Sequence, residues 1–448
     1  MGRELTIIAA MNPSDVRKER KPKFVSNGSV KQMGPTPWSS RGRRPNLLVL
    51  GASGQVGGAF LRRLGGRRDL FNEVVLLDRN EHVLKNRFLE HSRLRYTFVR
   101  HNLRLRDHGA DYVQLLRHRQ IDIVLDLTDL DTMPVLHATD AAGASYINTA
   151  LNDASAGVHE MVAAIHPTRQ QLRRAPHIIS SGMNPGAVNI WVVHGMRNYG
   201  VPREIIHFEY DSSMSFDRWR PLITWSRREF LTETVWEPTG QVDDGRIRVF
   251  DTNALANRMD LRPIMEPIHK LPSYPRGFLV LHEENVKLAQ NFGTSSKYIY
   301  ALHPKTMDFL VRRWRERGTV LISDLEIGDN TSIPLTGSDT IGVCLQYPRR
   351  RVYYMHSLSN QAVVGTNATC AQVAIGVWAG LTTMLSEPLQ SRIYFPTDLY
   401  GTIYPHVLFS NQRVGLFECG LHNKTWIVLK HLSELHPRLP RGKEQSII

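Results

Sequence analysis

Residues 46–58, Asn46-Leu-Leu-Val-Leu-Gly-Ala-Ser-Gly-Gln-Val-Gly-Gly58, join an apolar run to a glycine-rich turn. The run Asn46–Leu50 is short and aliphatic, which is typical of a buried strand, and Ala59–Leu64 continues with helical spacing. A strand, a glycine turn and a helix in this order form the phosphate-binding unit of a Rossmann domain. The sequence therefore predicts an α/β fold that begins at Asn46, with a nicotinamide cofactor as the first expected ligand.

Each of three glycines in this turn has its own physical reason. Gly51 permits the tight turn, Gly54 lets the backbone approach a pyrophosphate, and Gly57 lets the helix pack closely on the strand. The start of the helix then offers N–H groups and the positive end of its dipole to a phosphate. The expected cofactor-binding residues of this segment are Gly51, Ser53, Gly54, Gln55, Val56 and Gly57.

A second apolar run, Glu73–Asp78, ends in an acidic residue. Asp78 follows Gly57 by 21 residues, close to the spacing of about 20 at which a carboxylate binds the ribose hydroxyls of a dinucleotide. A carboxylate there disfavours the 2′-phosphate of NADP, so we expect NAD, although the neighbouring Arg79 would favour the phosphate. Asp78 and Arg79 are both expected to contact the cofactor.

Strands and helices alternate after these two strands. Strand-like runs cover 94–100, 121–127, 145–149 and 177–181, and 134–143 predicts a helix between two of them. This alternation indicates a doubly wound parallel sheet, whose ligands bind at the carboxyl ends of the strands. The residues expected at that edge are Thr128, Asp129, Asp131 and Asn148, assigned to the cofactor, and Asn184.

The composition excludes several classes of protein. The chain has 448 residues, of which 42% are hydrophobic, enough for two domains with sizeable cores. Its three cysteines form no CxxC pair, which favours free thiols in a reducing, cytoplasmic compartment. No histidine spacing such as HExxH occurs, so no metal is predicted. No apolar run approaches the roughly 20 residues of a membrane span, and the N-terminus lacks a signal-peptide pattern.

The chain is strongly basic, with a formal net charge of +14, and part of this charge lies in residues 1–45. That segment contains Pro, Gly and Ser and shows little apolar periodicity, so it predicts a disordered basic extension. A solvated tail is the simplest interpretation of it. A weak polyanion tether or a targeting arm is the alternative.

Six further segments share their order with one enzyme family. They are Ser180–Gly186, Glu209–Asp211, Thr224–Ser226 with Glu233 a short way on, His282–Asn285, Gly337–Val343 and Thr366–Leu381. Together they resemble the homospermidine synthase branch of the saccharopine dehydrogenase-like superfamily. The resemblance runs from about residue 46 to about residue 405.

This resemblance implies a Rossmann domain, a second α+β domain built on a mixed sheet, a tightly bound NAD and a homodimer. The expected divisions are a Rossmann domain at 46–186, a substrate and dimerisation domain at 187–365, a return helix packing on the Rossmann domain at 366–405, and a segment of open role at 406–448. Within them, 369–384 predicts a buried helix and 424–432 a last strand or helix.

The family's reaction joins small amines by hydride removal, exchange of the imine with a second amine, and hydride return. For this chemistry the resemblance assigns Trp225 as an aromatic platform for an ammonium and Glu233 as its anchor. Asn184 and His282 complete the expected catalytic residues. The expected substrate-binding residues are Asn152, Asp153, Glu209 and Asp339.

One position departs from the family pattern. The family carries a glutamate after a Tyr-Ile-Asp-Thr-like strand, where this chain has Asn152 followed by Asp153. An amide cannot pair with an ammonium as a carboxylate does. Asp153 can take its place if the loop shifts by one residue. Otherwise either the substrate differs or the activity is altered.

Two other functions fit the same features. A saccharopine-type reductase would reduce the imine of an amino acid, and its carboxylates would need arginines, for which the candidates are Arg218, Arg220, Arg227 and Arg228. A non-catalytic nucleotide-fold scaffold with a basic polyanion-binding tail is the other alternative.

Simpler roles also stay open for single residues: packing for Trp225, a surface acid for Glu233, a solvated helix start for His282 and a turn cap for Asp339.

Overall fold

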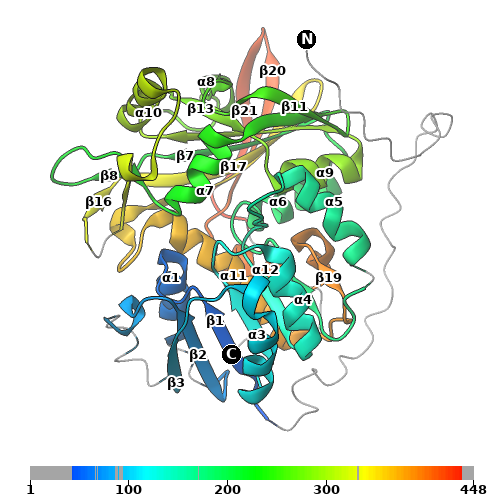
Figure 1. The fold of residues 1–448 in the computed structure, drawn as a ribbon. Coiled ribbons are helices and arrows are strands. Elements are labelled where there is room, and N and C mark those ends of the chain that lie inside the picture. Colours follow the sequence, from blue (N-terminus) through cyan, green and yellow to red (C-terminus); the bar gives the residue numbers. More distant parts are fainter. Residues whose placement is uncertain are drawn as a thin grey trace.

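The computed structural model describes residues 43–435 except 66, 68, 86–88, 90–93, 170 and 330–331. This part of the chain forms two β-sheets with helices around and between them (Figure 1). The first 42 residues of the predicted basic extension lie outside the described residues.

The first sheet has seven strands, all parallel, in the order β19-β6-β5-β4-β1-β2-β3. In chain order its strands are β1 (Asn46–Leu50), β2 (Glu73–Asp78), β3 (Tyr96–Arg100), β4 (Ile123–Asp126), β5 (Ser145–Asn148), β6 (His177–Ile178) and β19 (Ile393–Tyr394). The strand order runs outward from β1 in both directions, so the predicted doubly wound Rossmann sheet is confirmed.

Helices cover both faces of this sheet, which explains why β1 is apolar throughout. They include α1 (Gln55–Gly65), α3 (Leu105–His118), α4 (Thr132–Ala142) and α5 (Val158–Thr168), with the short η3 (His82–Lys85) after β2. Leu47 and Val49 belong to the hydrophobic cluster that includes α1, whereas Leu48 and Leu50 belong to the cluster with α3 and α4. A parallel strand that is buried on both faces needs a continuous apolar run.

The second sheet has ten strands, and most of its pairs are antiparallel. Its strands are β7 (Glu204–Asp211), β10 (Pro238–Asp243), β11 (Arg246–Asn253), β12 (Arg258–Asp260), β13 (Arg276–Val280), β14 (Ser295–Leu302), β17 (Ser338–Gln346), β18 (Arg350–Ser359), β20 (Gly415–His422) and β21 (Thr425–Leu432). The main order is β11-β10-β14-β7-β17-β18-β20-β21, in which β7 and β14 are parallel. The predicted mixed sheet of a second domain is therefore confirmed.

Short elements complete this domain. They are β8 (Met214–Ser215) paired with β16 (Leu335–Thr336), β9 (Leu222–Ile223) paired with β15 (Glu326–Ile327), α7 (Arg227–Leu231), η4 (Thr232–Trp236), α8 (Arg262–Met265), α9 (Glu283–Phe292), α10 (Pro304–Arg317), η5 (Ile322–Asp324) and η6 (Asn360–Ala362). The C-terminal segment of open role supplies β20 and β21, after η7 (Pro396–Leu399) and α12 (Tyr404–Asn411). It thus belongs to the second sheet.

Two helices connect the sheets. α6 (Ala187–Tyr199) leads to β7, and α11 (Ala368–Ser386) returns from β18 to pack on α1 and α12 (Figure 1). With 19 residues and a mean hydropathy of 1.4, α11 is long and apolar enough to cross a membrane. This corrects the expectation that no apolar run approaches that length. Because 78% of the helix window is buried inside the protein, α11 packs as a core helix, as 369–384 predicted.

α11 packs on the turn that ends the first domain. The closest contact is between two glycines, Gly376 of the helix and Gly182 of the turn. A Cβ built on Gly376 would lie 1.9 Å from the carbonyl oxygen of Gly182. Ser181 Oγ donates a hydrogen bond to the carbonyl of Gly376 at 2.9 Å, so helix and turn are also joined by a polar contact. This backbone approach leaves no space for a side chain at position 376.

Gly376→Ala is expected to destabilise the protein, because the new methyl group meets backbone rather than the end of a flexible side chain. We expect a loss of about 1–3 kcal/mol, measured as a lower midpoint of urea unfolding. The matched control is Gly109→Ala in α3, where a Cβ meets nothing within 4 Å. The control should stabilise by up to about 1 kcal/mol. An unchanged midpoint for Gly376→Ala would contradict the packing of α11 on the turn.

Candidate functional site

The glycine turn after β1 has the geometry of a dinucleotide cradle. Gly51 lies at φ +72°, and a Cβ there would come within 2.6 Å of the carbonyl oxygen of Leu127. A Cβ on Gly57 would come within 2.7 Å of the carbonyl oxygens of Gly51 and Ala52. Gly54 is exposed just before the first turn of α1. Because side chains are excluded by backbone at two of these positions, the turn fits the close approach that a pyrophosphate requires.

Asp78 lies at the end of β2 and binds the same turn. Its carboxylate accepts a hydrogen bond from Ser53 N at 2.9 Å and from Asn80 N at 3.1 Å. Ser53 Oγ donates to the carbonyl of Asn80 at 3.0 Å, which ties the turn to the residues after β2. Arg79 is exposed beside it. Each oxygen of Asp78 has a further lone pair, so the carboxylate can still accept a ribose hydroxyl.

Gln55 and Val56 begin α1 and are half-buried. Gln55 Nε2 donates to Asp329 Oδ2 at 3.3 Å, and Thr366 Oγ1 donates to the carbonyl of Gln55 at 3.4 Å. These contacts bring a loop of the second domain and the residues before α11 to the start of the cradle.

Several residues predicted at the carboxyl ends of the strands shape the loops there. Asn148 Oδ1 accepts from Ser180 N at 2.8 Å, and its Nδ2 donates to the carbonyl of Ala150 at 2.6 Å. Asn152 Nδ2 donates to the carbonyl of Thr128 at 3.2 Å. The amides of Asn148 and Asn152 therefore hold two loops together, which is a structural role beside any contact with a ligand.

The acidic residues of the same edge also bind backbone. Asp131 Oδ1 accepts from Ala154 N at 2.9 Å, and Asp153 Oδ1 accepts from Ser155 N at 2.8 Å. Asp129 follows Thr128, whose hydroxyl donates to the buried Asp126 at 2.6 Å. The sequence analysis did not assign Asp126 to this edge, because its position is that of an ordinary residue at the end of a strand.

In the second domain, strand alternation gathers acidic and aromatic side chains on one face of the sheet. Glu209 and Asp211 are two residues apart on β7, so their side chains point to the same face. Asp339 on β17 pairs with Asp211, and Tyr300 on β14 pairs with Glu209. The three carboxylates are thus neighbours across two adjacent strands, and all are buried.

Neutral donors surround this carboxylate cluster of Glu209, Asp211 and Asp339. Glu209 Oε2 accepts from Asn184 Nδ2 at 2.6 Å and from the hydroxyl of Tyr298. Other donors complete the shell: Thr224 Oγ1 to Asp211 at 2.6 Å, Ser213 N to Asp211 at 2.9 Å, and Gln372 Nε2 to Asp339 at 2.8 Å. Asp339 Oδ1 is buried without a hydrogen-bond partner.

No lysine or arginine within the described ranges forms an ion pair with these three carboxylates. Burial raises the pKa of Glu209 and of Asp211 above the ordinary range. Burial, followed by repulsion from Glu209 and Asp211, raises the pKa of Asp339 well above its usual value. The cluster is therefore stabilised either by protons or by a cation brought from outside.

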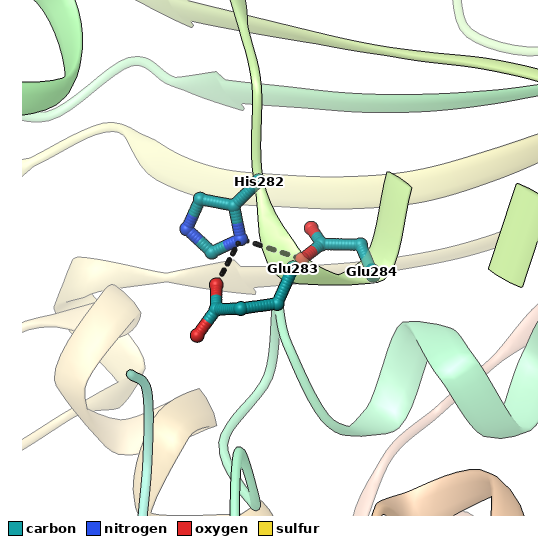
Figure 2. A group of neighbouring side chains, drawn as sticks. All are labelled: His282, Glu283 and Glu284. Carbon is teal, nitrogen blue, oxygen red and sulfur yellow. Dashed lines mark hydrogen bonds and ion pairs between the residues drawn. The ribbon is translucent and has the colours of Figure 1, made fainter. Parts of the chain in front are cut away.

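A second acidic group surrounds His282 at the start of α9 (Figure 2). Its Nδ1 lies 2.5 Å from Glu284 Oε2 and 3.0 Å from Glu283 Oε2, and its Nε2 lies 3.6 Å from Glu233 Oε1. Burial favours the neutral ring, but the three carboxylates outweigh it and raise the pKa of His282 well above its usual value. His282 is thus buried among carboxylates, and the solvated helix start is not its environment.

His282, Glu283 and Glu284 also place three metal-ligating atoms within 4.8 Å of one another. A tetrahedral metal with bonds of about 2.0–2.2 Å would hold its ligand atoms more than about 3 Å apart. The 2.5 Å contact between Nδ1 and Glu284 Oε2 is too short for that arrangement and fits a charge-assisted hydrogen bond. Glu283 Oε1 also accepts from Leu151 N at 2.6 Å, so this group joins the second domain to the first.

Trp225 lies just before α7, and Glu233 lies on the turn η4 that follows this helix. Trp225 is half-buried, and its Nε1 donates to the hydroxyl of Tyr300 at 3.2 Å, so it is linked to the carboxylate face of the sheet. Glu233 lies on the π-helical turn η4 with 27% of its side chain exposed. Burial and then Glu233 raise the pKa of Glu229, one turn earlier, to about 7.

The structure brings together part of the predicted site. Asn184, Glu209 and Asp339 meet in the carboxylate cluster, and Glu233 meets His282, whereas Asn152 and Asp153 bind loops of the first domain. Residues that sequence reasoning did not assign to the site are Asp211, Tyr298, Tyr300, Glu283 and Glu284. Asp211 could have been found from the sequence. It follows Glu209 by two residues, and residues two apart on a strand point to the same face.

Comparison with known proteins agrees with the fold. Residues 47–176 match the family model of the saccharopine dehydrogenase NADP binding domain. Homospermidine synthase from Legionella pneumophila, solved with NAD, aligns with a TM-score of 0.66 at 15% identity, over 82% of this chain and 88% of that chain. An amine dehydrogenase from Mycobacterium smegmatis aligns with a TM-score of 0.37 at 11% identity, over 79% of this chain and 95% of that chain. No curated protein matches the chain with significance.

Fold and site together define a two-domain protein with an NAD(P)-binding Rossmann domain and a second domain that buries an acidic cluster. The first domain is similar to the saccharopine dehydrogenase NADP binding domain, and the chain as a whole shares the fold of the Legionella homospermidine synthase. The predicted nicotinamide-dinucleotide domain and the predicted resemblance are thereby confirmed. The protein has a saccharopine dehydrogenase-like oxidoreductase fold.

Asp339→Asn is expected to stabilise the ligand-free protein at high pH. A carboxyl whose pKa is raised in the folded state contributes most to stability below its ordinary pKa, and this contribution is lost as the pH rises through the raised value. The variant should therefore melt higher than the wild type at about pH 8 and similarly at about pH 5. The control is the exposed Asp217→Asn, since the pKa of Asp217 is lowered to about 2 by its hydrogen bonds to Ser215 and Arg220. The same pH trend in both variants would contradict a buried, strained carboxylate at position 339.

Proposed function

We propose that this protein is an NAD-dependent enzyme that acts on small amines, with homospermidine synthase-like chemistry. The observation that carries the proposal is the carboxylate cluster of Glu209, Asp211 and Asp339, which is buried without a lysine or arginine among the described residues. Like charges held side by side in a dry environment repel one another unless a proton or a cation intervenes. An ammonium group supplies that cation.

The surroundings of the cluster favour an amine over an anionic substrate. A substrate with carboxylates would need free arginines, but Arg220 pairs with Asp217 and Glu326, and Arg227 donates to the carbonyl of Leu325 at 2.9 Å. Arg218 and Arg228, the other two candidates, are exposed. The buried acidic cluster therefore favours the amine enzyme over the amino-acid reductase. The scaffold alternative leaves the buried acidic cluster without a role.

A nicotinamide, when bound, supplies a hydride acceptor and donor. The residues of the chain would bind the amine and manage its protons. An ammonium must lose a proton before its nitrogen can take part in imine exchange, and Glu209, whose pKa burial has raised, is a suitable acceptor. Asn184 and Tyr298 hold the carboxylate of Glu209 in place through hydrogen bonds to Oε2.

Trp225 and Glu233 would bind a second cationic group. A desolvated ammonium over an indole ring gains roughly 0.5–2 kcal/mol. His282 Nε2 lies 3.6 Å from Glu233 Oε1, so this carboxylate is positioned on one side while part of the side chain stays exposed. The solved neighbour of the same fold is a homospermidine synthase, and this supports a diamine as substrate.

Three further expectations remain proposals. The protein is a homodimer, it acts in the cytoplasm, and the basic extension at residues 1–45 makes at most weak contact with polyanions. Asn152 in place of the family glutamate is the main reason for a substrate other than putrescine.

Asp78 should make the protein prefer NAD to NADP. Its carboxylate can accept a ribose hydroxyl and would repel a 2′-phosphate, whereas Arg79 is exposed at the same place. Calorimetric titration should give tighter binding of NAD by the wild type, and Asp78→Ala should narrow the difference. A wild type that binds NADP more tightly would show that Arg79 determines the choice.

Incubation with putrescine and NAD, followed by mass detection of homospermidine, tests the reaction. Glu233→Gln should lose a charge-assisted contact of roughly 1.5–3 kcal/mol, about a ten- to hundredfold loss of rate. Trp225→Ala should also lower the rate, and Asn152→Glu should raise it. Glu316→Gln on the outer α10 is the control and should leave the rate unchanged.

Absence of product from both wild type and Asn152→Glu, with NAD binding established by titration, would contradict the diamine. Oxidation of NADH in the presence of an amino acid together with a carbonyl compound would then support the reductase. A protein that binds no dinucleotide at all would support the scaffold.

A further inference from the structure

The side chain of Glu283 joins the two domains at the start of α9. Its Oε2 lies 3.0 Å from Nδ1 of His282 in the second domain (Figure 2), and its Oε1 accepts a hydrogen bond from Leu151 N of the first domain at 2.6 Å. Glu283 and Leu151 are both buried, with 3% and 6% of their surfaces exposed. Water therefore competes poorly for either contact, and the carboxylate is held from two sides.

On the second-domain side, this double contact leads to the proposed amine site. Nε2 of His282 lies 3.6 Å from Oε1 of Glu233, the partly exposed acid at that site. Nδ1, on the other side of the ring, lies between the oxygens of Glu283 and Glu284. Glu283 therefore helps to orient the ring that Glu233 meets, so it acts on the amine site through His282 without itself touching an amine.

On the first-domain side, the double contact leads to the loops beside the cofactor cradle. Leu151 precedes Asn152, whose Nδ2 donates to the carbonyl of Thr128 at 3.2 Å. Thr128 lies against the glycine turn, because its Cγ2 is 3.1 Å from the place of a Cβ on Gly51. A dinucleotide bound in the turn would restrict the loop of Thr128 and, through Asn152, the backbone that Glu283 holds.

We propose that Glu283 is a positioning residue that couples the two binding sites, so that a dinucleotide in the glycine turn strengthens the binding of an amine at Glu233. This role rests on the proposed amine function. Its physical basis is ordering: the first ligand fixes one end of the connection, so the second ligand has less conformational freedom to remove. By thermodynamic linkage the amine must strengthen dinucleotide binding by the same factor, which for coupled sites is typically about 5- to 150-fold.

An amide at position 283 separates this role from one that only holds a loop. Leu151 N is a donor, and Nδ1 of His282 is also a donor because it faces two carboxylate oxygens. Glutamine has a single side-chain oxygen, so Glu283→Gln can accept from one of these donors and not from both, whichever way its amide is turned. Holding the loop of Leu151 needs one acceptor, whereas coupling the two sites needs both.

Calorimetric titration of the full chain with putrescine, with and without ADP-ribose, tests the coupling. ADP-ribose carries the pyrophosphate that the glycine turn would hold but lacks the nicotinamide ring that would lie beside the amine, so its effect must pass through the protein. In the wild type, saturating ADP-ribose should tighten putrescine binding about fivefold or more, and saturating putrescine should tighten ADP-ribose binding by the same factor. In Glu283→Gln this factor should fall close to one.

Lys287→Ala is the matched control on the same helix. Lys287 lies one turn after Glu283, and its Nζ lies 5.0 Å from the centre of the Phe395 ring. This variant also removes a contact of α9 but leaves both contacts of Glu283 in place, so it should keep the wild-type factor. Thermal melting without ligands establishes that each variant is folded.

Two results would overturn the coupling and leave the proposed function standing. One is a wild type that binds putrescine equally tightly with and without ADP-ribose. The other is a folded Glu283→Gln protein that keeps the wild-type factor, because Glu283 would then only hold the loop of Leu151. A wild type that binds no putrescine, even with NAD bound, would contradict the amine function itself, and the coupling would fall with it.

Discussion

Burial of three carboxylates on neighbouring strands, without a basic side chain beside them, is the constraint on which the second domain depends. Glu209, Asp211 and Asp339 share one face of the sheet because of strand alternation and register, so none of them can be moved apart without breaking the pairing of β7 and β17. The neutral donors around them, among them Asn184, are fixed by elements from both domains. The ligand-free protein therefore carries an electrostatic cost that a proton or a cation would relieve, as functional sites often do.

His282 lies in a second acidic group, in which Glu233, Glu283 and Glu284 surround its ring. The contact of Glu283 with Leu151 N couples this group to the first domain, and Glu233 is its partly exposed member. The carboxylate cluster of Glu209, Asp211 and Asp339 differs from it, because no lysine or arginine among the described residues forms an ion pair with that cluster.

The first domain could be predicted almost completely from sequence, because its signals are local. The run Asn46–Leu50, the glycines after it and Asp78 lie within 33 positions of one another, and their order alone defines the unit. The carboxylate cluster could be predicted only in part. Glu209 and Asp339 were reached through the family resemblance, but Asp211, Tyr298 and Tyr300 come together through pairing of strands far apart in the chain, which no local pattern records. The buried helix at 369–384 was predicted from its small, apolar composition, but the elements that cover it, α1 and α12, are not recorded in any local pattern.

The chain order of the first sheet has a consequence for biosynthesis. Its strand β1 is among the first described residues to be made, but its edge strand β19 is Ile393–Tyr394, which follows most of the second domain. During translation the sheet of the first domain therefore stays incomplete until most of the second domain has emerged from the ribosome. A fragment that stops after β6 would lack both β19 and α11, so one cut in the chain cannot separate a complete first domain from the second.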